Sequence, residues 1–129
     1  LRSIAMATAL IADDHSLYRS GLALLLSDQL DYDEVLEAGS LSAASEIMDA
    51  RPGLDLALFD LAMPGMNGFE LYQEVKKSGE YNSLPFIFLT AVDDFYAKKF
   101  GKELGGAAYM TKPVDLDELE QILKEKMGK

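Results

Sequence analysis

The amino-acid sequence predicts an α/β protein with one five-stranded parallel sheet, and three observations support this fold class. Short apolar runs alternate five times with longer segments whose apolar residues recur at helical spacing. The strand-like runs are apolar almost throughout, as parallel strands are when helices cover both faces of their sheet. The chain has 129 residues, of which 49% are apolar and 26% charged, so it suits a single globular domain.

The first strand and the first helix are predicted near the start of the chain. Residues 7–12 form a short apolar run that stops at Asp13. Ser16 or His15 can cap a helix over residues 16–29. The leucines expected to face the sheet from this helix are Leu17, Leu22, Leu25 and Leu26.

A second pair of elements leads to the third strand. The pattern predicts a weak strand over residues 34–38 and a helix over residues 42–50 that ends before Pro52. The third strand is predicted over residues 54–59 and stops at Asp60. Only one aspartate interrupts its apolar run, and a run this nearly continuous indicates burial on both faces.

The second half of the chain repeats the alternation. A loop rich in glycine and proline leads into a helix over residues 69–78, and the most strand-like segment, residues 84–89, ends at Thr90. A further helix is predicted over residues 93–104, although Gly101 weakens that pattern. The last two elements are a strand over residues 107–110 and a helix over residues 115–127.

Right-handed crossovers between these strands predict an open, doubly wound sheet in the order 2-1-3-4-5. That is the flavodoxin-like (βα)5 fold, a three-layer sandwich with helices on both faces of the sheet. We expect one domain over residues 7–127. Residues 1–6, which end at the first methionine, are expected to be an N-terminal extension or a tag remnant.

The composition disfavours several classes of partner. The 12 basic and 22 acidic side chains leave a net charge of −10, and a domain this acidic is repelled by nucleic acid and by anionic membrane surfaces. No apolar run approaches the ~18 residues that cross a bilayer. The chain has no cysteine, which excludes disulfides and thiolate metal sites. We expect a cytoplasmic protein with neither nucleic acid nor membrane as a direct partner.

Polar side chains follow four of the predicted strands at the point where each strand ends. Asp13 and Asp14 follow the first strand, Asp60 the third, Thr90 the fourth and Lys112 the fifth. In the order 2-1-3-4-5 these four strands are neighbours, and ligands of open α/β sheets bind beyond the carboxyl ends of the strands. The sequence therefore predicts one cleft that contains all of these side chains.

Three carboxylates in one cleft repel each other, by about 4 kcal/mol for two charges ~4 Å apart at an effective dielectric of about 20. Either one of them stays protonated or a cation neutralises the cluster. The ligands are all oxygen atoms, so Mg²⁺ is the expected ion and Mn²⁺ can substitute for it. Lys112 adds a positive charge and Thr90 a hydroxyl donor, which together would stabilise a phosphoryl group on Asp60.

Four segments, taken in order, resemble the receiver domains of response regulators in two-component signalling, which have a chemotaxis-regulator-like fold. They are residues 10–15 (Leu-Ile-Ala-Asp-Asp-His), 58–68 (Leu-Phe-Asp-Leu-Ala-Met-Pro-Gly-Met-Asn-Gly), 88–91 (Phe-Leu-Thr-Ala) and 109–113 (Tyr-Met-Thr-Lys-Pro). The resemblance covers the chain from Ala7 to about Met127. Each segment alone is a weak signal, whereas the four in this order and spacing are a strong one.

The resemblance implies which residues bind the phosphoryl group and the metal ion. Asp60 would be the phosphoacceptor. Asp13 and Asp14 would hold Mg²⁺ together with Asp60, one of them often through water. The backbone carbonyl of Ala62 would complete the protein ligands of the ion.

The resemblance also implies how the domain responds to phosphorylation. Thr90 would bond the phosphoryl group and Lys112 would pair with it. Tyr109 would change rotamer together with Thr90 and so act as a switch residue. The peptide bond between Lys112 and Pro113 would be cis, as an X–Pro bond can be at modest cost.

The function that the resemblance implies is that of a signalling phosphoacceptor, not of an enzyme that turns over a substrate. A histidine kinase or a phosphotransfer protein would donate the phosphoryl group in a Mg²⁺-dependent phosphorelay step. The added charge of about −1.5 to −2 would bias the face formed by residues 93–104, 107–110 and 115–127, where a partner, an output domain or a second copy would bind. The side chains of Ala62 and Val92 cannot hydrogen-bond a hydrolytic water, so autodephosphorylation should be slow.

Three other functions compete with this interpretation. Many Mg²⁺-dependent phosphohydrolases use a second acid two residues after the nucleophile, where this chain has Ala62. A nucleotide- or flavin-binding domain needs a glycine- or hydroxyl-rich phosphate loop after the first strand, where this chain has Asp13 and Asp14. A receiver-like binding module that is never phosphorylated is disfavoured because the acidic set, the threonine and the lysine are all present.

Overall fold

The computed structural model describes residues 7–51, 53–60, 84–90 and 107–127. These residues form a five-stranded parallel sheet in the order β2-β1-β3-β4-β5, which confirms the predicted fold class and strand order. The strands are β1 (Thr8–Ala12), β2 (Glu34–Ala38), β3 (Leu56–Asp60), β4 (Phe86–Thr90) and β5 (Ala107–Thr111). The helices among the described residues are α1 (Ser16–Gln29), α2 (Leu41–Ala50) and α5 (Leu116–Met127). The helices predicted over residues 69–78 and 93–104 lie outside the described part of the chain.

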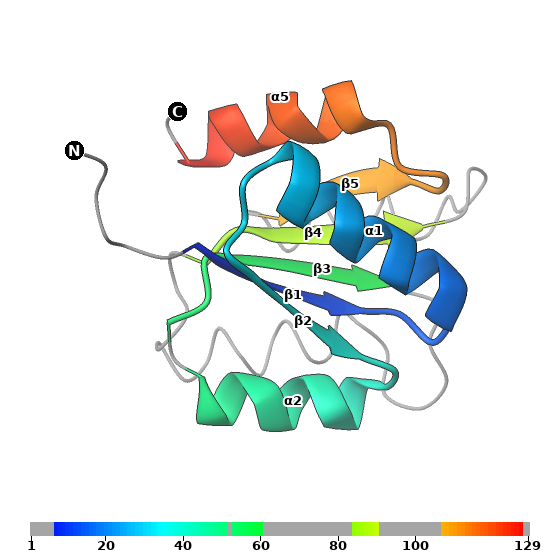
Figure 1. Cartoon of the computed structure of the whole chain (residues 1–129), viewed down its shortest axis with the longest axis vertical. Helices are drawn as coiled ribbons and strands as arrows, with labels where there is room; N and C mark the ends of the chain where they lie inside the picture. Colours follow the sequence, from blue (N-terminus) through cyan, green and yellow to red (C-terminus); the bar gives the residue numbers. More distant parts are fainter. Residues whose placement is uncertain (1–6, 52, 61–83, 91–106, 128–129) are drawn as a thin grey trace.

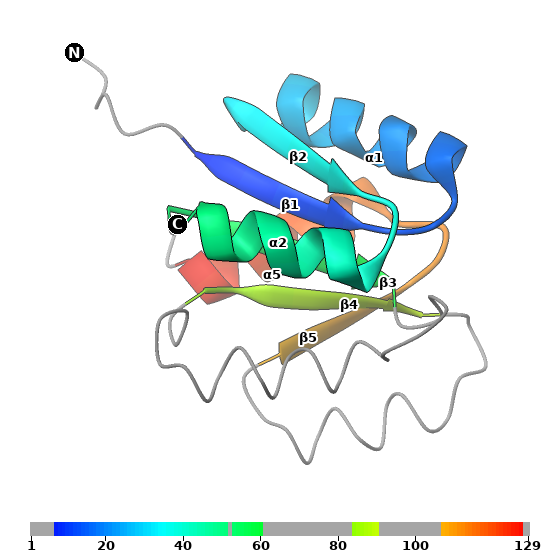
Figure 2. The same ribbon diagram turned by 90° about the horizontal axis from the view of Figure 1, so that it is seen from below.

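Helices cover both faces of the sheet (Figure 1 and Figure 2). α1 and α5 lie on one face and α2 lies on the other, while all strands point the same way, so their carboxyl ends share one edge. Every residue of β1, β3 and β4 is buried, whereas most of the outer strand β2 is half-buried. This is the burial expected of a parallel sheet between helical layers.

Two apolar cores fill the space between the sheet and its helices. On the α2 side, the rings of Phe59, Phe86 and Phe88 pack in series, with centroid distances of 5.3 and 6.2 Å. On the side of α1 and α5, the second core is mostly aliphatic and includes Leu26 and Leu58. Because side chains alternate along each strand, every second residue belongs to the same core.

Two of the predicted site residues are part of the strands and do not lie after them. β3 begins two residues later than predicted and includes Asp60, which pairs with Leu89 of β4. β4 runs to Thr90, which pairs with Thr111 of β5. The sheet therefore holds the backbones of both residues at the edge where the strands end.

The first helix corrects one prediction. Leu17, predicted to face the sheet, is 86% exposed. The buried residues of α1 are Leu22 and Leu26, and the half-buried Tyr18 continues this i, i+4 stripe toward the start of the helix. Leu17 precedes Leu22 by five residues, which at 3.6 residues per turn places it on a different side of the helix. Tyr18, and not its neighbour Leu17, is the residue of the first turn that faces the sheet.

The two helices of the first half begin differently. His15 is the N-cap residue of α1 in place of Ser16, and its side chain makes no capping hydrogen bond. α2 begins at Leu41, one residue earlier than predicted, because Ser40 caps it by accepting a hydrogen bond of 3.1 Å from the Ala43 N–H. A hydroxyl cap therefore defines the start of α2 but not that of α1.

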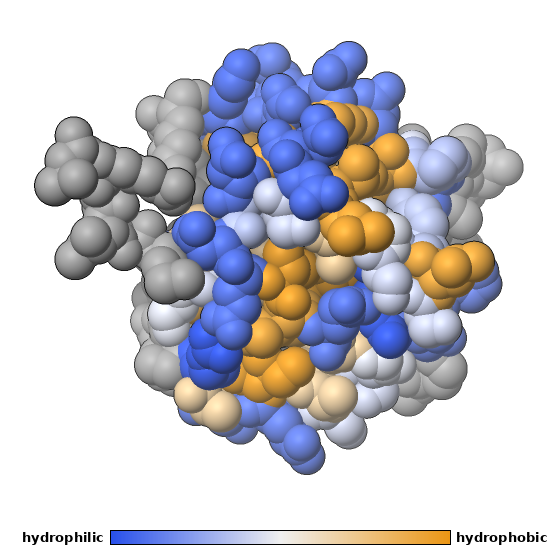
Figure 3. Space-filling model, in the orientation of Figure 1, coloured by the Kyte–Doolittle hydropathy of each residue, from blue (hydrophilic) through white to orange (hydrophobic). Residues whose placement is uncertain are grey.

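Figure 3 shows the molecule from the side on which α1 and β2 lie in Figure 1. Hydrophilic side chains cover α5 at the top of the view, and apolar side chains reach the surface in the region of β2, between α1 and α2. Val35 and Leu36 of β2 are half-buried, in keeping with the position of this strand at the edge of the sheet. Among the described residues, no helix combines the length and the hydropathy needed to cross a bilayer.

Candidate functional site

The acidic residues predicted at the strand ends form one group at the carboxyl edge of the sheet. Asp13 and Asp14 follow β1 and Asp60 closes β3, and one carboxylate oxygen from each lies within 4.8 Å of the others. Asp13 and Asp60 are buried and Asp14 is exposed. In the described part of the chain, no other group of three His, Cys, Asp or Glu side chains has this spacing.

The alternation of side chains along the strands decides which face each site residue takes. Asp13, Asp60 and Lys112 each lie two residues beyond a buried member of the core under α1 and α5. Thr90 lies two residues beyond Phe88, which belongs to the core under α2. Asp60 and Thr90 therefore lie on opposite faces, and the contacts of the Lys112 ammonium with Asp13, Asp60 and the Tyr18 ring of α1 place it on the face of Asp60.

Hydrogen bonds hold Asp13 through its backbone and through its side chain. Its N–H donates to the Ala38 carbonyl at 3.0 Å, and its own carbonyl accepts from Arg19 Nη1 at 2.6 Å. Its Oδ1 accepts from the His15 N–H at 2.9 Å. Arg19 also pairs with Glu37 of β2 at 3.0 Å. The loop after β1 is thus tied to both β2 and α1, with Asp13 Oδ2 left for the site.

Lys112 supplies the positive charge between the two buried carboxylates. Its Nζ lies 2.6 Å from Asp13 Oδ2 and 3.0 Å from Asp60 Oδ2. Burial alone would lower the pKa of Lys112, but the hydrogen bonds with Asp13 and Asp60 outweigh burial and raise this pKa above its ordinary value. Lys112 is therefore protonated at physiological pH, and its ammonium links the ends of β1, β3 and β5.

Backbone hydrogen bonds also fix the loop that carries Lys112. The Lys112 N–H donates to the Thr90 carbonyl at 3.0 Å, and the Val114 N–H donates to the Tyr18 hydroxyl at 3.0 Å. The peptide bond between Lys112 and Pro113 is cis, the form that the resemblance implied. The Tyr18 ring centroid lies 4.7 Å from Lys112 Nζ. Burial raises the pKa of Tyr18, so its hydroxyl stays neutral at physiological pH.

Thr90 and Tyr109 lie on neighbouring strands, on the side of the α2 core. Thr90 is 2% exposed at the end of β4. Tyr109 of β5 is half-buried and pairs with Phe88, and the centroids of these two rings are 5.6 Å apart. Because Tyr109 pairs with Phe88, it lies beside the position two residues before Thr90 on β4. Ala62 and Val92 lie outside the described residues.

The donor set fits a hard divalent cation. Three carboxylates against one ammonium leave a formal charge of −2, which one Mg²⁺ or Mn²⁺ would neutralise. All side-chain ligands are oxygens, as these ions prefer. Asp14 is exposed, so one side of the group is open to water, and Mg²⁺ usually keeps part of its hydration shell.

Two residues of α1 contact the site and are missing from the sequence prediction. Tyr18 could have been found from its i, i+4 spacing to Leu22 and Leu26, which places it on the buried side of the helix. Arg19 carries no comparable signal. Its hydrogen bond with the Asp13 carbonyl depends on the orientation of α1 relative to the loop that follows β1.

Comparison with known sequences agrees with this geometry. The family model of the response regulator receiver domain matches residues 9–124. Sporulation initiation phosphotransferase F of Bacillus subtilis is 31% identical over 119 residues, which cover 90% of this chain and 90% of that protein. The sensory transduction protein LytT of Bacillus subtilis is 36% identical over 121 residues, which cover 93% of this chain and 48% of that protein. This chain spans about half the length of the first curated relatives that it matches.

Solved structures of similar proteins share the fold. A response regulator receiver domain protein from Clostridium thermocellum superposes with a TM-score of 0.83 at 26% identity, over 95% of each chain. The chemotaxis response regulator CheY4 of Vibrio cholerae gives a TM-score of 0.81 at 28% identity, over 95% of this chain and 99% of that one. Both likenesses extend over nearly the whole chain.

Proposed function

The chain belongs to the family of response regulator receiver domains, and from this membership we propose that Asp60 accepts a phosphoryl group in a Mg²⁺-dependent step. Receiver domains are signalling phosphoacceptors, and response regulators interact with histidine kinases and phosphotransfer proteins. The proposed donor is such a kinase or phosphotransfer protein, in the cytoplasm. The chain would catalyse only its own phosphorylation and a slow autodephosphorylation.

The surroundings of Asp60 support this proposal most directly. The residue is 5% exposed, and its Oδ2 lies 3.0 Å from the Lys112 ammonium. Oxygens of two further carboxylates lie within 4.8 Å. A phosphoryl group on Asp60 would therefore enter a pre-formed site in which low dielectric strengthens its attraction to the ammonium.

In the proposed transfer, a bond forms between phosphorus and a carboxylate oxygen of Asp60, and the bond between phosphorus and the donor nitrogen breaks. The imidazole of the donor keeps that electron pair as the leaving group. Asp13 and Asp14 would hold Mg²⁺ together with Asp60 and the Ala62 carbonyl. A bound Mg²⁺ neutralises charge on the carboxylates and on the phosphoryl oxygens. Lys112 stabilises the charge on the transferred group.

The switch would begin at Lys112 and Thr90, which would approach the phosphoryl group from the two faces of the sheet at its carboxyl edge. The group adds a charge of about −1.5 to −2, which draws the Lys112 ammonium and the Thr90 hydroxyl toward it. Lys112 and Thr90 are already joined by a backbone hydrogen bond of 3.0 Å, so the ends of β4 and β5 respond together. Tyr109 would then change rotamer together with Thr90. A target, an output domain or a second copy would bind the face predicted from β5, α5 and residues 93–104, the last of which lie outside the described residues.

The phosphorylated form should be long-lived because Ala62 and Val92 cannot position a hydrolytic water through their side chains. A phosphate-release assay on the purified phosphoprotein measures this lifetime. We expect a half-life of minutes or longer. A half-life of seconds would contradict the assignment of slow autodephosphorylation.

The test of the proposed function is incubation with acetyl phosphate and Mg²⁺ followed by intact mass measurement. The wild type should gain one phosphoryl group and Asp60→Asn none. Asp55→Asn is the matched control, because Asp55 also adjoins β3 but binds the Thr8 N–H at the opposite end of the sheet. A gain that persists in Asp60→Asn would refute the acceptor assignment, and a wild type without any gain would refute the function.

A further inference from the structure

Tyr18 contacts the loop after β5 at two points. Its hydroxyl accepts a hydrogen bond of 3.0 Å from the Val114 N–H, and its ring centroid lies 4.7 Å from Lys112 Nζ. The two contacts fall on either side of Pro113, which has no N–H of its own. One side chain of α1 therefore holds both the backbone of this loop and its ammonium group.

The chemistry of lysine explains why such a contact matters. The Lys112 ammonium stands at the end of a flexible four-carbon stem, and its side chain is 25% exposed. Without metal, Asp13 Oδ2 and Asp60 Oδ2 hold it at 2.6 and 3.0 Å. A divalent cation bound to these carboxylates competes for the same oxygens. The ring of Tyr18 is uncharged and binds no metal, so this contact remains when the carboxylates are engaged.

We propose that Tyr18 is a positioning residue that keeps the Lys112 ammonium within reach of a phosphoryl group on Asp60. The ring acts through cation–π attraction, for which 4.7 Å to the centroid is well within range. The hydroxyl accepts the hydrogen bond of the Val114 N–H and so fixes the backbone two residues after Lys112. This proposal rests on the proposed function of Asp60.

The core fixes Tyr18 in turn. It stands one helical turn before Leu22, which is 3% exposed in the core under α1 and α5. Asp13, Asp60 and Lys112 lie on this same side of the sheet. An aromatic residue at this point of α1 can therefore reach the ammonium directly, whereas a residue on the α2 side could not.

The first experiment measures the Lys112 side chain itself and does not depend on phosphorylation. NMR relaxation of the Lys112 methylene groups is compared in Mg²⁺ for the wild type, Tyr18→Leu and Tyr18→Phe. The order parameters of these methylene groups should fall in Tyr18→Leu. They should fall less in Tyr18→Phe, which keeps the ring. Tyr32→Phe is the matched control, because Tyr32 is a buried tyrosine of the same core. Unchanged order in Tyr18→Leu would overturn the proposal.

The second experiment measures the rate of phosphorylation by acetyl phosphate. Tyr18→Leu should slow it about 3- to 10-fold, and Tyr18→Phe by less, as expected for the loss of a cation–π contact at a partly buried site. In a Lys112→Met background, Tyr18→Leu should cause no further loss, because its effect passes through the lysine. Fully additive effects would reduce Tyr18 to a general structural role and overturn the proposal.

The two measurements separate the two hypotheses. A wild type that takes no phosphoryl group would refute the function of Asp60, and the NMR comparison would still decide whether Tyr18 restrains Lys112. A wild type that is phosphorylated at the same rate as Tyr18→Leu would refute the positioning role and leave the function intact. Circular dichroism of each variant shows that the comparison is made between folded proteins.

Discussion

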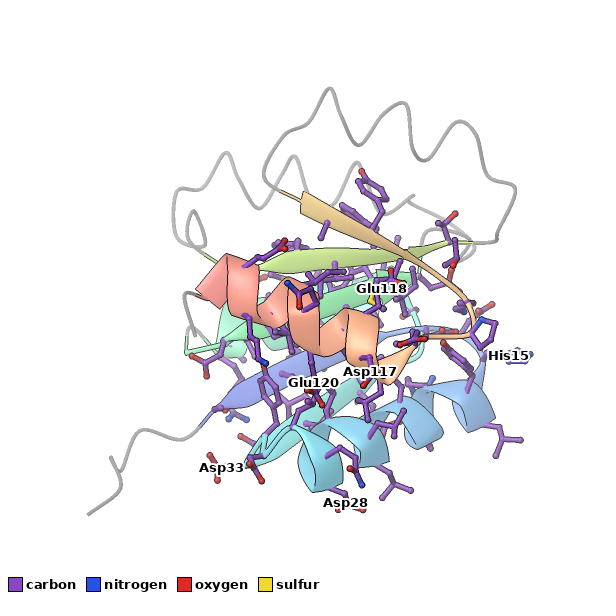
Figure 4. All side chains as sticks on the ribbon, turned by 90° about the horizontal axis from the view of Figure 1, so that it is seen from above. His15, Asp28, Asp33, Asp117, Glu118 and Glu120 are labelled. Atoms are coloured by element: carbon purple, nitrogen blue, oxygen red, sulfur yellow. The ribbon has the colours of Figure 1, made fainter. Side chains whose placement is uncertain are left out.

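The aspartates at the two ends of the parallel sheet have different partners. At the amino end, Asp55 Oδ2 accepts the Thr8 N–H at 2.8 Å, and Asp33 Oδ2 accepts the Ala7 N–H at 2.9 Å. At the carboxyl end, the buried aspartates lie against the ammonium of a lysine instead. Figure 4 shows the two ends, with Asp33 at one and His15 at the other.

The direction of the strands explains this difference. All strands of a parallel sheet begin at one edge and end at the other, so N–H groups are available at the first edge and carbonyl oxygens at the second. An N–H satisfies a carboxylate, whereas a carbonyl oxygen repels it. At the carboxyl end the His15 N–H satisfies Asp13 Oδ1, and the Lys112 ammonium lies against the remaining oxygens, Asp13 Oδ2 and Asp60 Oδ2. The same residue type is a structural anchor at one end of this protein and a candidate cation ligand at the other.

Metal affinity should separate the two ends most strongly. Asp13→Asn removes one charged ligand and should weaken Mg²⁺ binding by about 10- to 100-fold. Asp55→Asn changes a carboxylate at the opposite end of the sheet, where salt screens most of its effect, and should leave the affinity within about twofold. Isothermal titration calorimetry with Mg²⁺ measures both. A similar loss in the two variants would show that the ends do not differ in this way.

Removal of the ammonium should destabilise the carboxyl end in the absence of metal. Lys112→Met leaves Asp13 and Asp60 as neighbouring buried carboxylates, and the free energy of unfolding should fall by about 2–3 kcal/mol. Mg²⁺ should bind this variant more tightly than the wild type, because no ammonium competes for the oxygens. Urea unfolding with and without Mg²⁺ measures both effects.

The control for the lysine is Lys124→Met on α5, which replaces an exposed lysine. Its free energy of unfolding should stay within about 0.5 kcal/mol of the wild type, with or without Mg²⁺. If Lys112→Met behaved in the same way, the ion pairs with the two aspartates would contribute nothing to stability.

The amino end should show its own dependence on pH. Burial, and then the charge of Asp55, raises the pKa of Tyr32 to about 12. The folded protein thus holds this proton to higher pH than the unfolded chain, whose tyrosine pKa is about 10. The stabilisation is complete below pH ~10 and should be lost as the pH rises through ~12, by about 2–3 kcal/mol in all. Urea unfolding at a series of alkaline pH values measures this slope.

Tyr32→Phe isolates that contribution, since it keeps the ring and removes the proton. Its stability should fall less steeply than that of the wild type above pH ~10. The raised pKa of Lys112 acts in the same direction at the other end, so part of the alkaline loss should remain. An unchanged slope in Tyr32→Phe would show that this tyrosine titrates alike in the folded and unfolded chains.

The smallest expected effect concerns the exposed side of α1. Leu17→Ser should change the free energy of unfolding by less than about 0.5 kcal/mol, because Leu17 is 86% exposed. Leu22→Ala, at a position that is 3% exposed, should cost about 2–4 kcal/mol. Thermal or urea unfolding of the two variants compares them. A loss above about 1 kcal/mol in Leu17→Ser would mean that this leucine packs in solution.

The strand ends were predictable because they follow from local pattern and from strand direction. Asp13, Asp60 and Lys112 each come at the end of an apolar run, and parallel strands bring such ends to one edge whatever the details of packing. The face that each residue takes was not predictable. Both faces of β1, β3 and β4 are buried, so their apolar runs carry no alternation that distinguishes the α2 side from the other.

The helix faces were harder to predict for a related reason. α1 carries leucines at 17, 22, 24, 25 and 26, which offer more than one apolar stripe. Only contact with the sheet selects the stripe of Tyr18, Leu22 and Leu26, and this choice brings Tyr18 to the site while it exposes Leu17.

The sequence by itself determined the five strands, their order and the set of carboxylate, hydroxyl and ammonium groups at one edge of the sheet. These features depend on short-range patterns and on chain direction. The tertiary structure alone decided which groups touch. Lys112 bridges Asp13 and Asp60, Arg19 holds the Asp13 carbonyl, and Tyr18 meets a residue 96 positions away. These contacts depend on how helix and sheet pack, which local residue patterns do not encode.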